Sequence, residues 1–234
     1  MPLTYVITGA SRGLGAEFVR QLSSQGNIVI ACARNPDASK ELLDLVNNKT
    51  VYAVTLDTVD PESVQSAAAQ IQQLAPEGID ILINNAGIAG SLGANITNTD
   101  ADEYRSLFNT NVVGTSNVTQ SLLPLLRKGN TRRIINITSL LGSLTFTTPT
   151  PFLPSYRVTK AAENMLGKLF ADELADEDFT VLNVHPGYVQ TDMGGKNADI
   201  TTEVSIRGMI SVIENSTKES NGKFLDYEGN TVSW

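Results

Sequence analysis

The sequence contains very little cysteine or histidine. Cys32 is its only cysteine and His185 its only histidine among 234 residues. One thiol cannot form a disulfide within the chain, which suits a reducing, cytoplasmic compartment. Catalytic zinc sites and Ser/His/Asp hydrolases both depend on histidine. We therefore expect neither a zinc-dependent dehydrogenase nor such a hydrolase, and no bound metal, and we interpret His185 as a strand-end residue.

Positive charge is also scarce. Lysine and arginine number 17 against 25 acidic residues, so the formal net charge is -8. Binding to a nucleic acid backbone requires concentrated positive charge. The one basic group, around Arg127 and Arg133, lies where a helix is predicted to end, and there it suits the helix dipole. We expect no nucleic acid partner.

Long hydrophobic runs are missing. No apolar run approaches the roughly eighteen residues that a membrane-crossing helix needs. The segment Met1–Gly9 is too short to act as a signal peptide. We expect a cytoplasmic protein without a membrane partner.

Short runs rich in valine and isoleucine recur along the chain, as they do in buried parallel strands. They are Thr4–Ile7, Ile28–Ala33, Val51–Leu56, Ile79–Ile83, Arg133–Thr138 and Thr180–Val184. Stretches with helical spacing separate them, such as Val64–Leu74. This alternation predicts an α/β fold with a doubly wound parallel sheet of the Rossmann type, helices on both faces, and one domain over residues 1–234. The loops Gly87–Asn98, Leu141–Ser155 and Gly187–Ile200 follow strands and should surround the substrate.

A glycine-rich turn follows the first predicted strand. It contains Gly9, Ser11, Arg12, Gly13, Leu14 and Gly15, and it leads directly into the helical run Ala16–Ser24. Glycines let the backbone approach a pyrophosphate, and the first N–H groups of the helix favour an anion. The glycines alone would also fit a plain strand-to-helix turn. Their position at the first strand-to-helix turn favours a dinucleotide site.

The end of the second predicted strand indicates which dinucleotide binds. Proteins that prefer NAD usually place an acidic residue there to bind the ribose hydroxyls. This sequence has Ala33 followed by Arg34, and Arg12 lies in the glycine turn. Two guanidinium groups could bind a 2'-phosphate, which predicts NADP. The alternative is that both arginines are ordinary surface residues.

Tyr156 and Lys160 stand four residues apart at the start of a long helical run, Val158–Leu174. This spacing places both side chains on one helix face. A free phenol has a pKa of about 10, and a nearby ammonium group should lower that pKa and make the tyrosine a usable acid or base. On its own, such a pair is more often a contact on a helix surface.

The order of the motifs resembles the single-domain branch of the short-chain dehydrogenase/reductase family over nearly the whole chain. They are Thr8-Gly9-x3-Gly13-x-Gly15, Asn84-Asn85-Ala86-Gly87, Asn111, Ser139, Tyr156-x3-Lys160 and Pro186-Gly187. The stretches Gly187–Gly195 and Asn221–Trp234 further resemble C-factor-like and small carbonyl-reductase-like members. The resemblance implies a seventh strand near Lys223–Leu225, and hence about seven strands.

The resemblance also implies catalytic roles. Ser139 would hydrogen-bond the carbonyl oxygen, and Tyr156 would give that oxygen its proton. Lys160 would lower the pKa of the phenol and hold the nicotinamide ribose. Asn111 would bind a water that links Lys160 to solvent. Each of these residues also has an ordinary structural alternative, such as a strand-end hydroxyl for Ser139 or local hydrogen bonding for Asn111.

By the same resemblance, further residues would contact the cofactor. Those expected at the adenine are Asp57 and Thr58; those expected to line the cofactor are Asn85, Ala86, Gly87, Pro186 and Gly187; and those expected at the carboxamide are Val189 and Thr191. The activity expected is reversible, NADPH-dependent reduction of a ketone or aldehyde to the alcohol. The alternatives are an NADP-binding regulatory or signalling protein and, ranked last, an epimerase or dehydratase of the extended branch.

The loop before Tyr156 bears on the substrate. Sixteen residues separate Ser139 from Tyr156, a few more than the family usually has. The loop Leu144–Pro154 contains Phe146, Phe152 and three prolines, and Tyr188 and Met193 should face it. We predict a medium-sized, largely apolar substrate, with surface packing of the loop as the alternative. Apolar residues on more than one face of Val158–Leu174 predict a homodimer or homotetramer, unless this helix is simply buried.

Overall fold

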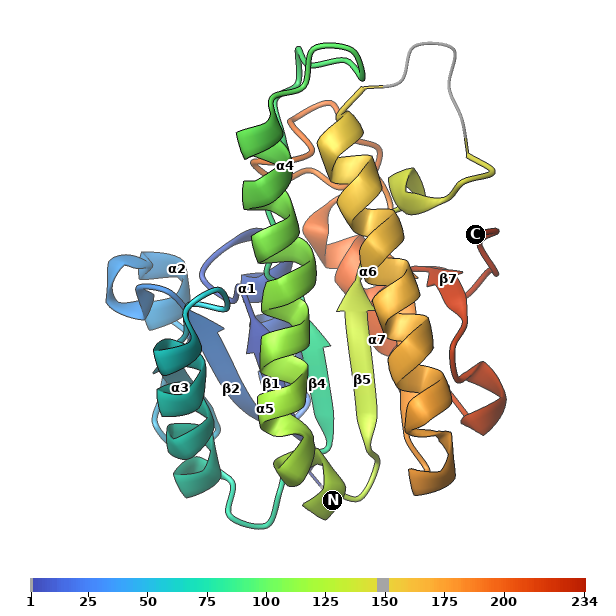
Figure 1. Ribbon diagram of the computed structural model, residues 1–234. Helices are drawn as coiled ribbons and strands as arrows, with labels where there is room; N and C mark the ends of the chain where they lie inside the picture. Colours follow the sequence, from blue (N-terminus) through green and yellow to red (C-terminus); the bar gives the residue numbers. More distant parts are fainter. Residues whose placement is uncertain (1, 147–151) are drawn as a thin grey trace.

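The computed structural model describes residues 2–146 and 152–234, which form one parallel sheet covered by helices on both faces (Figure 1). The sheet has seven strands in the order β3-β2-β1-β4-β5-β6-β7. The strands are β1 Thr4–Thr8, β2 Ile28–Ala33, β3 Val51–Thr55, β4 Ile81–Asn84, β5 Arg133–Ile137, β6 Thr180–His185 and β7 Phe224–Asp226. This architecture confirms the predicted doubly wound fold, including the seventh strand.

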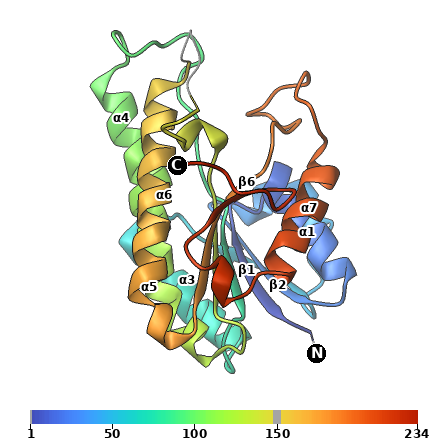
Figure 2. The same cartoon turned by 90° about the vertical axis from the view of Figure 1, so that its right-hand side faces the viewer.

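The helices form two layers, one on each side of the sheet (Figure 2). Their bounds are α1 Gly13–Ser24, α2 Lys40–Leu43, α3 Pro61–Leu74, α4 Ala101–Phe108, α5 Thr115–Lys128, α6 Pro154–Glu173 and α7 Thr202–Glu214. Alternate strand residues point to opposite faces. Ile7 and Ile83 therefore pack with α1 and α7 in one core, while Val6 and Leu82 pack with α3, α5 and α6 in the other. No described helix is long and apolar enough to cross a membrane.

Several elements begin or end at residues that the apolar pattern alone did not indicate. Helix α6 begins at Pro154, four residues before the predicted Val158, because proline is well suited to the first turn of a helix. Strand β4 begins at Ile81, because Ile79 donates its N–H to the Leu125 carbonyl instead of joining the sheet. Both changes leave the predicted order of elements intact.

The strand order reverses beside β1. Strand β1 pairs with β2 on one side and with β4 on the other, so the chain winds in opposite directions from this point. In open α/β sheets the ligand crevice lies beyond the carboxyl ends of the strands at such a reversal. The turn after β1 and the loop after β4 therefore mark where a ligand should bind.

Candidate active site

In the glycine turn after β1, Gly9 and Gly15 are closely packed against other backbone segments, whereas Gly13 has free space around it. A Cβ added to Gly9 would lie 2.9 Å from the Ala86 Cα, and one added to Gly15 would lie 2.2 Å from the Gly9 carbonyl oxygen. Gly13 has a φ of +55°, and its added Cβ would meet nothing nearer than the Thr191 side chain at 3.6 Å. Gly9 and Gly15 thus bring the backbone segments together, while Gly13 leaves space in front of the helix.

The first turn of α1 is available to an anion. Arg12 is the residue before the helix, its backbone is extended, and its side chain makes no capping hydrogen bond. The first N–H groups of a helix have no partner within the helix and carry the positive end of its dipole. This uncapped end, together with the open position at Gly13, fits a pyrophosphate as the glycine pattern predicted.

The loop after β4 is fastened to the same turn. The Thr8 hydroxyl accepts hydrogen bonds from the N–H groups of Asn85 (3.0 Å) and Ala86 (2.9 Å). The Asn85 amide donates to the carbonyls of Thr8 (2.9 Å) and Gly9 (3.2 Å). Asn85 was expected to line the cofactor, and its side chain also braces the turn. Thr8 was named only as part of the motif, yet its hydroxyl joins the two segments.

The two predicted arginines lie at the surface on the β1–β2 side of this crevice. Arg34 is exposed just beyond β2. Arg12 is exposed as well, and its Nε lies 3.5 Å from the Asp192 carboxylate. The Ser39 hydroxyl donates to the Ser11 carbonyl and thereby joins the segment after β2 to the glycine turn. Ser39 was not predicted, because nothing in its sequence context indicates this contact.

Asp57 and Thr58 follow β3 and turn toward α3 and the start of α5. The Asp57 N–H donates to the Ser63 hydroxyl at 2.9 Å. Thr58 is buried, and a Cβ on Gly114 would lie 2.6 Å from its Oγ1. The segment is thus held against α3 and the start of α5, and adenine binding by Asp57 and Thr58 stays a prediction.

Asn111 lies in a π-helical turn, Asn109–Gly114, between α4 and α5. Such turns often occur at functional sites. Its side chain is fully buried and exchanges hydrogen bonds with the backbone of Ile88, at 2.9 Å each way. Its amide also donates to the Thr159 hydroxyl at 3.0 Å. Asn111 therefore holds the loop after β4 against α6, and the predicted water at this residue stays a prediction.

Tyr156 and Ser139 come together beyond β5. Ser139 precedes the short 3₁₀ turn Leu140–Gly142, and its hydroxyl accepts the Leu141 N–H at 3.2 Å. Tyr156 is buried and packs with Leu107 and Leu153. Hydrogen bonding with Ser139 acts to lower the pKa of Tyr156. The structure thus brings two of the predicted catalytic residues together from separate elements.

Lys160 is buried close to Tyr156. Its ammonium nitrogen lies 5.6 Å from the centre of the Tyr156 ring and donates to the Ile137 carbonyl at 2.9 Å. It also binds a carboxylate oxygen of Glu163 at 2.6 Å. Glu163 was not predicted. The available signal was an acidic residue three positions after Lys160, a spacing that places both on neighbouring parts of one helix face.

The sequence predicted that the pKa of Tyr156 is lowered, but in this structure the net effect of its surroundings is to raise that pKa. Burial raises the pKa of Tyr156 above its ordinary value, because the charged phenolate loses solvation. Lys160 lowers the pKa as predicted, but Glu163 raises it. Lys160 itself loses stabilisation through burial, while the Glu163 carboxylate raises its pKa above the ordinary value and keeps it protonated.

The loop after β6 completes the edge of the sheet. Gly187 has a φ of +87°, and a Cβ there would lie 2.7 Å from the Ile200 side chain. The Ser205 hydroxyl donates to the Pro186 carbonyl at 2.6 Å. The Thr191 hydroxyl accepts the Gly194 N–H at 3.0 Å. These contacts hold Pro186, Gly187 and Thr191 in a fixed loop, and their contact with a cofactor stays a prediction.

Val189 is buried and His185 is half-buried. Val189 is 5% exposed and bridges to Ile200. Burial lowers the pKa of His185 to about 4, so this side chain is neutral near pH 7. His185 therefore behaves as the expected strand-end residue. Among residues 2–146 and 152–234, no group of His, Cys, Asp and Glu is placed to hold a metal ion.

Arg157 organises the two described ends of the loop before Tyr156. Its guanidinium carbon lies 5.9 Å from the Phe146 ring centre and 5.6 Å from that of Phe152. It also donates to the backbone carbonyls of both residues. Phe146 and Phe152 are partly exposed, as are Tyr188 and Met193 on the loop after β6. Pro149 and Pro151 lie outside the described residues, so the predicted shaping of a pocket by this loop stays a prediction.

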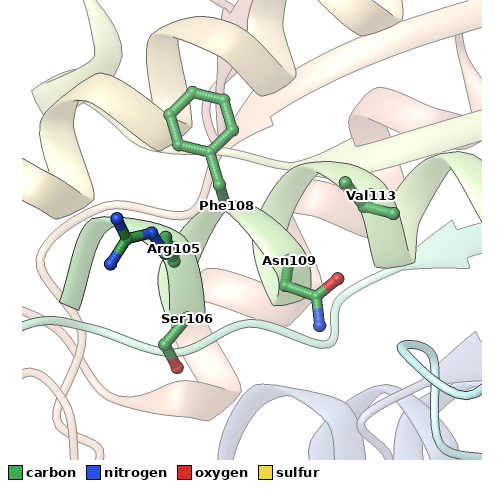
Figure 3. A pocket seen from close by; sticks show the side chains of 5 residues that line it. All are labelled: Arg105, Ser106, Phe108, Asn109 and Val113. Carbon is green, nitrogen blue, oxygen red and sulfur yellow. The ribbon is translucent and has the colours of Figure 1, made fainter. Parts of the chain in front are cut away.

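A surface hollow lies on α4 and the π-helical turn (Figure 3). It is lined by Arg105, Ser106, Phe108, Asn109 and Val113. None of these side chains is among the predicted catalytic or cofactor-binding residues. The predicted residues gather instead at the carboxyl ends of the strands.

Comparison with known proteins matches residues 4–201 to the short chain dehydrogenase family. An uncharacterised oxidoreductase of Schizosaccharomyces pombe is 34% identical over 247 residues, covering 97% of this chain and 96% of that protein. The C-signal protein of Myxococcus xanthus is 40% identical over 156 residues, covering 67% of this chain and 93% of that protein. The crystal structure of NADPH-bound carbonyl reductase from chicken fatty liver has a TM-score of 0.92 and 31% identity, with 100% of both chains covered.

Proposed function

Because this chain belongs to the short-chain dehydrogenase/reductase family, as its sequence predicted, we propose that it uses NADPH to reduce a medium-sized, largely apolar ketone or aldehyde. The observation that carries this proposal is the buried group of Tyr156, Ser139 and Lys160 at the carboxyl edge of the sheet. This edge also holds the uncapped start of α1, which fits a dinucleotide. A proton donor and a cofactor site at one edge of the sheet are what carbonyl reduction requires.

The residues present fit NADPH, which the similar chicken carbonyl reductase binds. When bound, NADPH supplies the hydride. The N–H groups at the start of α1 would hold its pyrophosphate, and the exposed Arg12 and Arg34 would hold the 2'-phosphate. Lys160 has three N–H donors, and Ile137 and Glu163 occupy two of them. The third is available for a ribose hydroxyl.

Ser139 and Tyr156 supply the proton chemistry. The Ser139 hydroxyl donates a hydrogen bond to the carbonyl oxygen and polarises it. Negative charge develops on that oxygen during reduction, and the Tyr156 hydroxyl transfers its proton there. Burial disfavours the phenolate and thus keeps the proton on Tyr156 until it is needed. In the reverse reaction, alcohol oxidation, Tyr156 must first lose that proton.

The surroundings of the site indicate the class of substrate. Phe146 and Phe152, before Tyr156, and Tyr188 and Met193, after β6, are exposed apolar side chains. Arg157 is the cation beside this loop, and it is held between the two phenylalanine rings. This arrangement favours an apolar carbonyl compound over a strongly anionic one. We further propose a homo-oligomer in the cytoplasm, where the buried free thiol of Cys32 would stay reduced.

The test is to follow NADPH absorbance with a panel of apolar ketones and aldehydes, beside phosphorylated carbonyl compounds. We expect turnover of the apolar compounds and slower turnover with NADH. Tyr156→Phe should lower kcat by about a hundredfold to ten-thousandfold, because it removes the general acid while keeping the ring. Full activity in this variant would contradict the proposed mechanism.

The cofactor assignment is checked in the same assay. Arg34→Asp should raise the KM for NADPH and narrow the difference between NADPH and NADH, because it replaces a cation with a group that repels the 2'-phosphate. Equal use of both cofactors by the original chain would contradict the NADP assignment. Binding of NADPH without turnover of any carbonyl compound would instead support a regulatory role, which the similarity to the C-signal protein suggests.

A further inference from the structure

The Lys160–Glu163 pair is unusual because both charged groups are buried. The side chains of Lys160 and Glu163 are 5% and 1% exposed, and their charged atoms are 2.6 Å apart. The other ion pair found on the described part of α6, Lys168 with Asp172, lies at the surface. Removing two charges from water is strongly unfavourable, and apolar residues of similar volume often stabilise a protein at least as well. Stability alone therefore does not explain why Glu163 is an acid.

The carboxylate of Glu163 is only partly used by hydrogen bonds. One carboxylate oxygen binds the Lys160 ammonium, while the other has no hydrogen-bond partner among the described residues. The Thr115 hydroxyl lies nearby and donates to the Asn111 carbonyl. The Lys160 ammonium thus contacts Glu163 and also lies near the loop after β4, where a Cβ added to Gly87 would come within 3.6 Å of it.

Lys160 and Glu163 are the charges that act directly on the Tyr156 phenol. The packed elements present other polar groups. Strand β6 ends in the neutral His185, and α4 presents Glu103, whose carboxylate is engaged by the hydroxyls of Ser91 and Ser155.

Among residues 2–146 and 152–234, the other groups that these elements present are two uncharged side chains and one further cation, Arg157. The π-helical turn contributes the Asn111 amide and the 3₁₀ turn the Ser139 hydroxyl, both uncharged. On α6 itself, Arg157 lies between the Phe146 and Phe152 rings. Among the described residues, the charges that act on the pKa of the phenol are therefore the Lys160 ammonium and the Glu163 carboxylate in contact with it.

We propose that Glu163 is a positioning residue that neutralises Lys160, so that Tyr156 stays protonated and donates to a carbonyl over a wider pH range than Lys160 alone would allow. The inference rests on the proposed reductase function and adds to it a control of its pH dependence. Lys160 would still bind and orient, but its charge would favour the phenolate much less. A tyrosine beside an unpaired lysine ammonium loses its proton at a lower pH. With Glu163 present, Tyr156 would still be protonated at that pH, and the site would still work as a reductase.

The direct test is an NMR titration of the protein labelled with ¹³C-tyrosine, with the Tyr156 signal assigned from Tyr156→Phe. We expect Tyr156 of the original chain to remain a neutral phenol through pH 10, its ordinary midpoint. In Glu163→Gln the titration midpoint should fall by at least about one pH unit, a tenfold rise in the acid dissociation constant. Asp172→Asn removes an exposed carboxylate from the same helix and should leave the midpoint unchanged.

Glu163→Asp keeps the charge and should retain most of the original behaviour. The alkaline limit of kcat/KM for reduction should move with the NMR midpoint in each variant. An unchanged Tyr156 midpoint in folded Glu163→Gln would overturn the proposal. If Glu163→Gln does not fold, the original chain still decides, because a Tyr156 phenolate forming well below pH 10 would overturn it. A shifted midpoint without turnover of any carbonyl compound would support the effect of Glu163 on the Tyr156 phenol but refute the reductase function.

Discussion

His185 shows how loss of solvation can outweigh a nearby carboxylate, since Asp226 acts to raise its pKa. It ends β6, and loss of solvation lowers its pKa to about 4. An unfolded histidine has a pKa of about 6.5. Between these two values the unfolded chain binds more protons than the folded one, so the stability falls as the pH falls from about 6.5 to 4. Above about pH 6.5 His185 is neutral in both the folded and the unfolded chain, and it no longer makes the stability depend on pH.

We expect His185→Gln to reduce the acid sensitivity of the fold. The difference in unfolding free energy between pH 7 and pH 5 should be smaller in the variant by about 2 kcal/mol, since glutamine does not titrate. Urea unfolding at both values measures this difference. Because the chain has one histidine, its proton NMR signal can be followed directly. A titration midpoint near pH 6.5 for His185 in the folded protein would refute the lowered pKa.

Single residues also show what sequence patterns can and cannot indicate. The spacing of Tyr156 and Lys160 predicted their shared helix face, because one helix sets it. The same pattern predicted a lowered Tyr156 pKa, and this was wrong because burial and Glu163 oppose Lys160. Burial depends on packing against distant segments, which no local spacing reveals.

At the scale of elements, a row of buried asparagines connects the central strands. The Asn84 amide donates to the Asn136 carbonyl oxygen, and the Asn136 amide donates to that of Asn183, at 3.0 Å each. Asn183 in turn donates to the Asn164 backbone carbonyl of α6 at 3.0 Å. A glycine of α6, Gly167, lies directly over this row. The asparagine row links β4, β5 and β6, whose carboxyl ends lead into the site, to α6, the helix that carries Tyr156.

Gly167→Ala should destabilise the protein, although alanine is normally favoured over glycine in a helix by about 1 kcal/mol. The added Cβ would lie 2.1 Å from the Asn183 side-chain oxygen and 2.7 Å from the Asn136 amide. Displacing these buried groups should lower the unfolding free energy by about 1 to 3 kcal/mol. Chemical denaturation provides the measurement.

The matched control is the same substitution in an Asn183→Ala background. Removing the Asn183 amide makes room for the new methyl group, so the second substitution should be less harmful there. A more stable Gly167→Ala single variant would contradict the role of this row.

At the scale of the whole molecule, an apolar strip on α6 faces outward. Val158, Met165 and Leu169 are exposed, Met165 at 59% and Leu169 at 57%. Their spacing of seven and four residues places them on one side of the helix. In both views, α6 lies in the outer layer beside α4 and α5 (Figures 1 and 2). This exposed strip supports the expected association of like subunits and does not fit a simply buried helix.

We expect sedimentation velocity to show that the original chain is a dimer or tetramer. The double variant Met165→Glu/Leu169→Glu should shift the association equilibrium toward the monomer. Charges in the centre of an apolar interface strongly oppose association. Val204→Glu replaces an exposed apolar residue on α7, on the other side of the sheet, and should leave the assembly unchanged. A monomeric original chain would contradict the prediction.

The sequence by itself determined the order of the strands and helices, the glycine turn and the Tyr156–Lys160 spacing. These features depend on local backbone geometry and on periodic burial, both of which are written in short stretches of chain. Tertiary structure alone decided that Thr8 and Asn85 join two strand ends, that Arg157 contacts two rings, and that Glu163 pairs with Lys160 away from water. Such contacts arise only when distant segments meet and exclude water, and water exclusion is also what makes the charge of Glu163 matter to Tyr156.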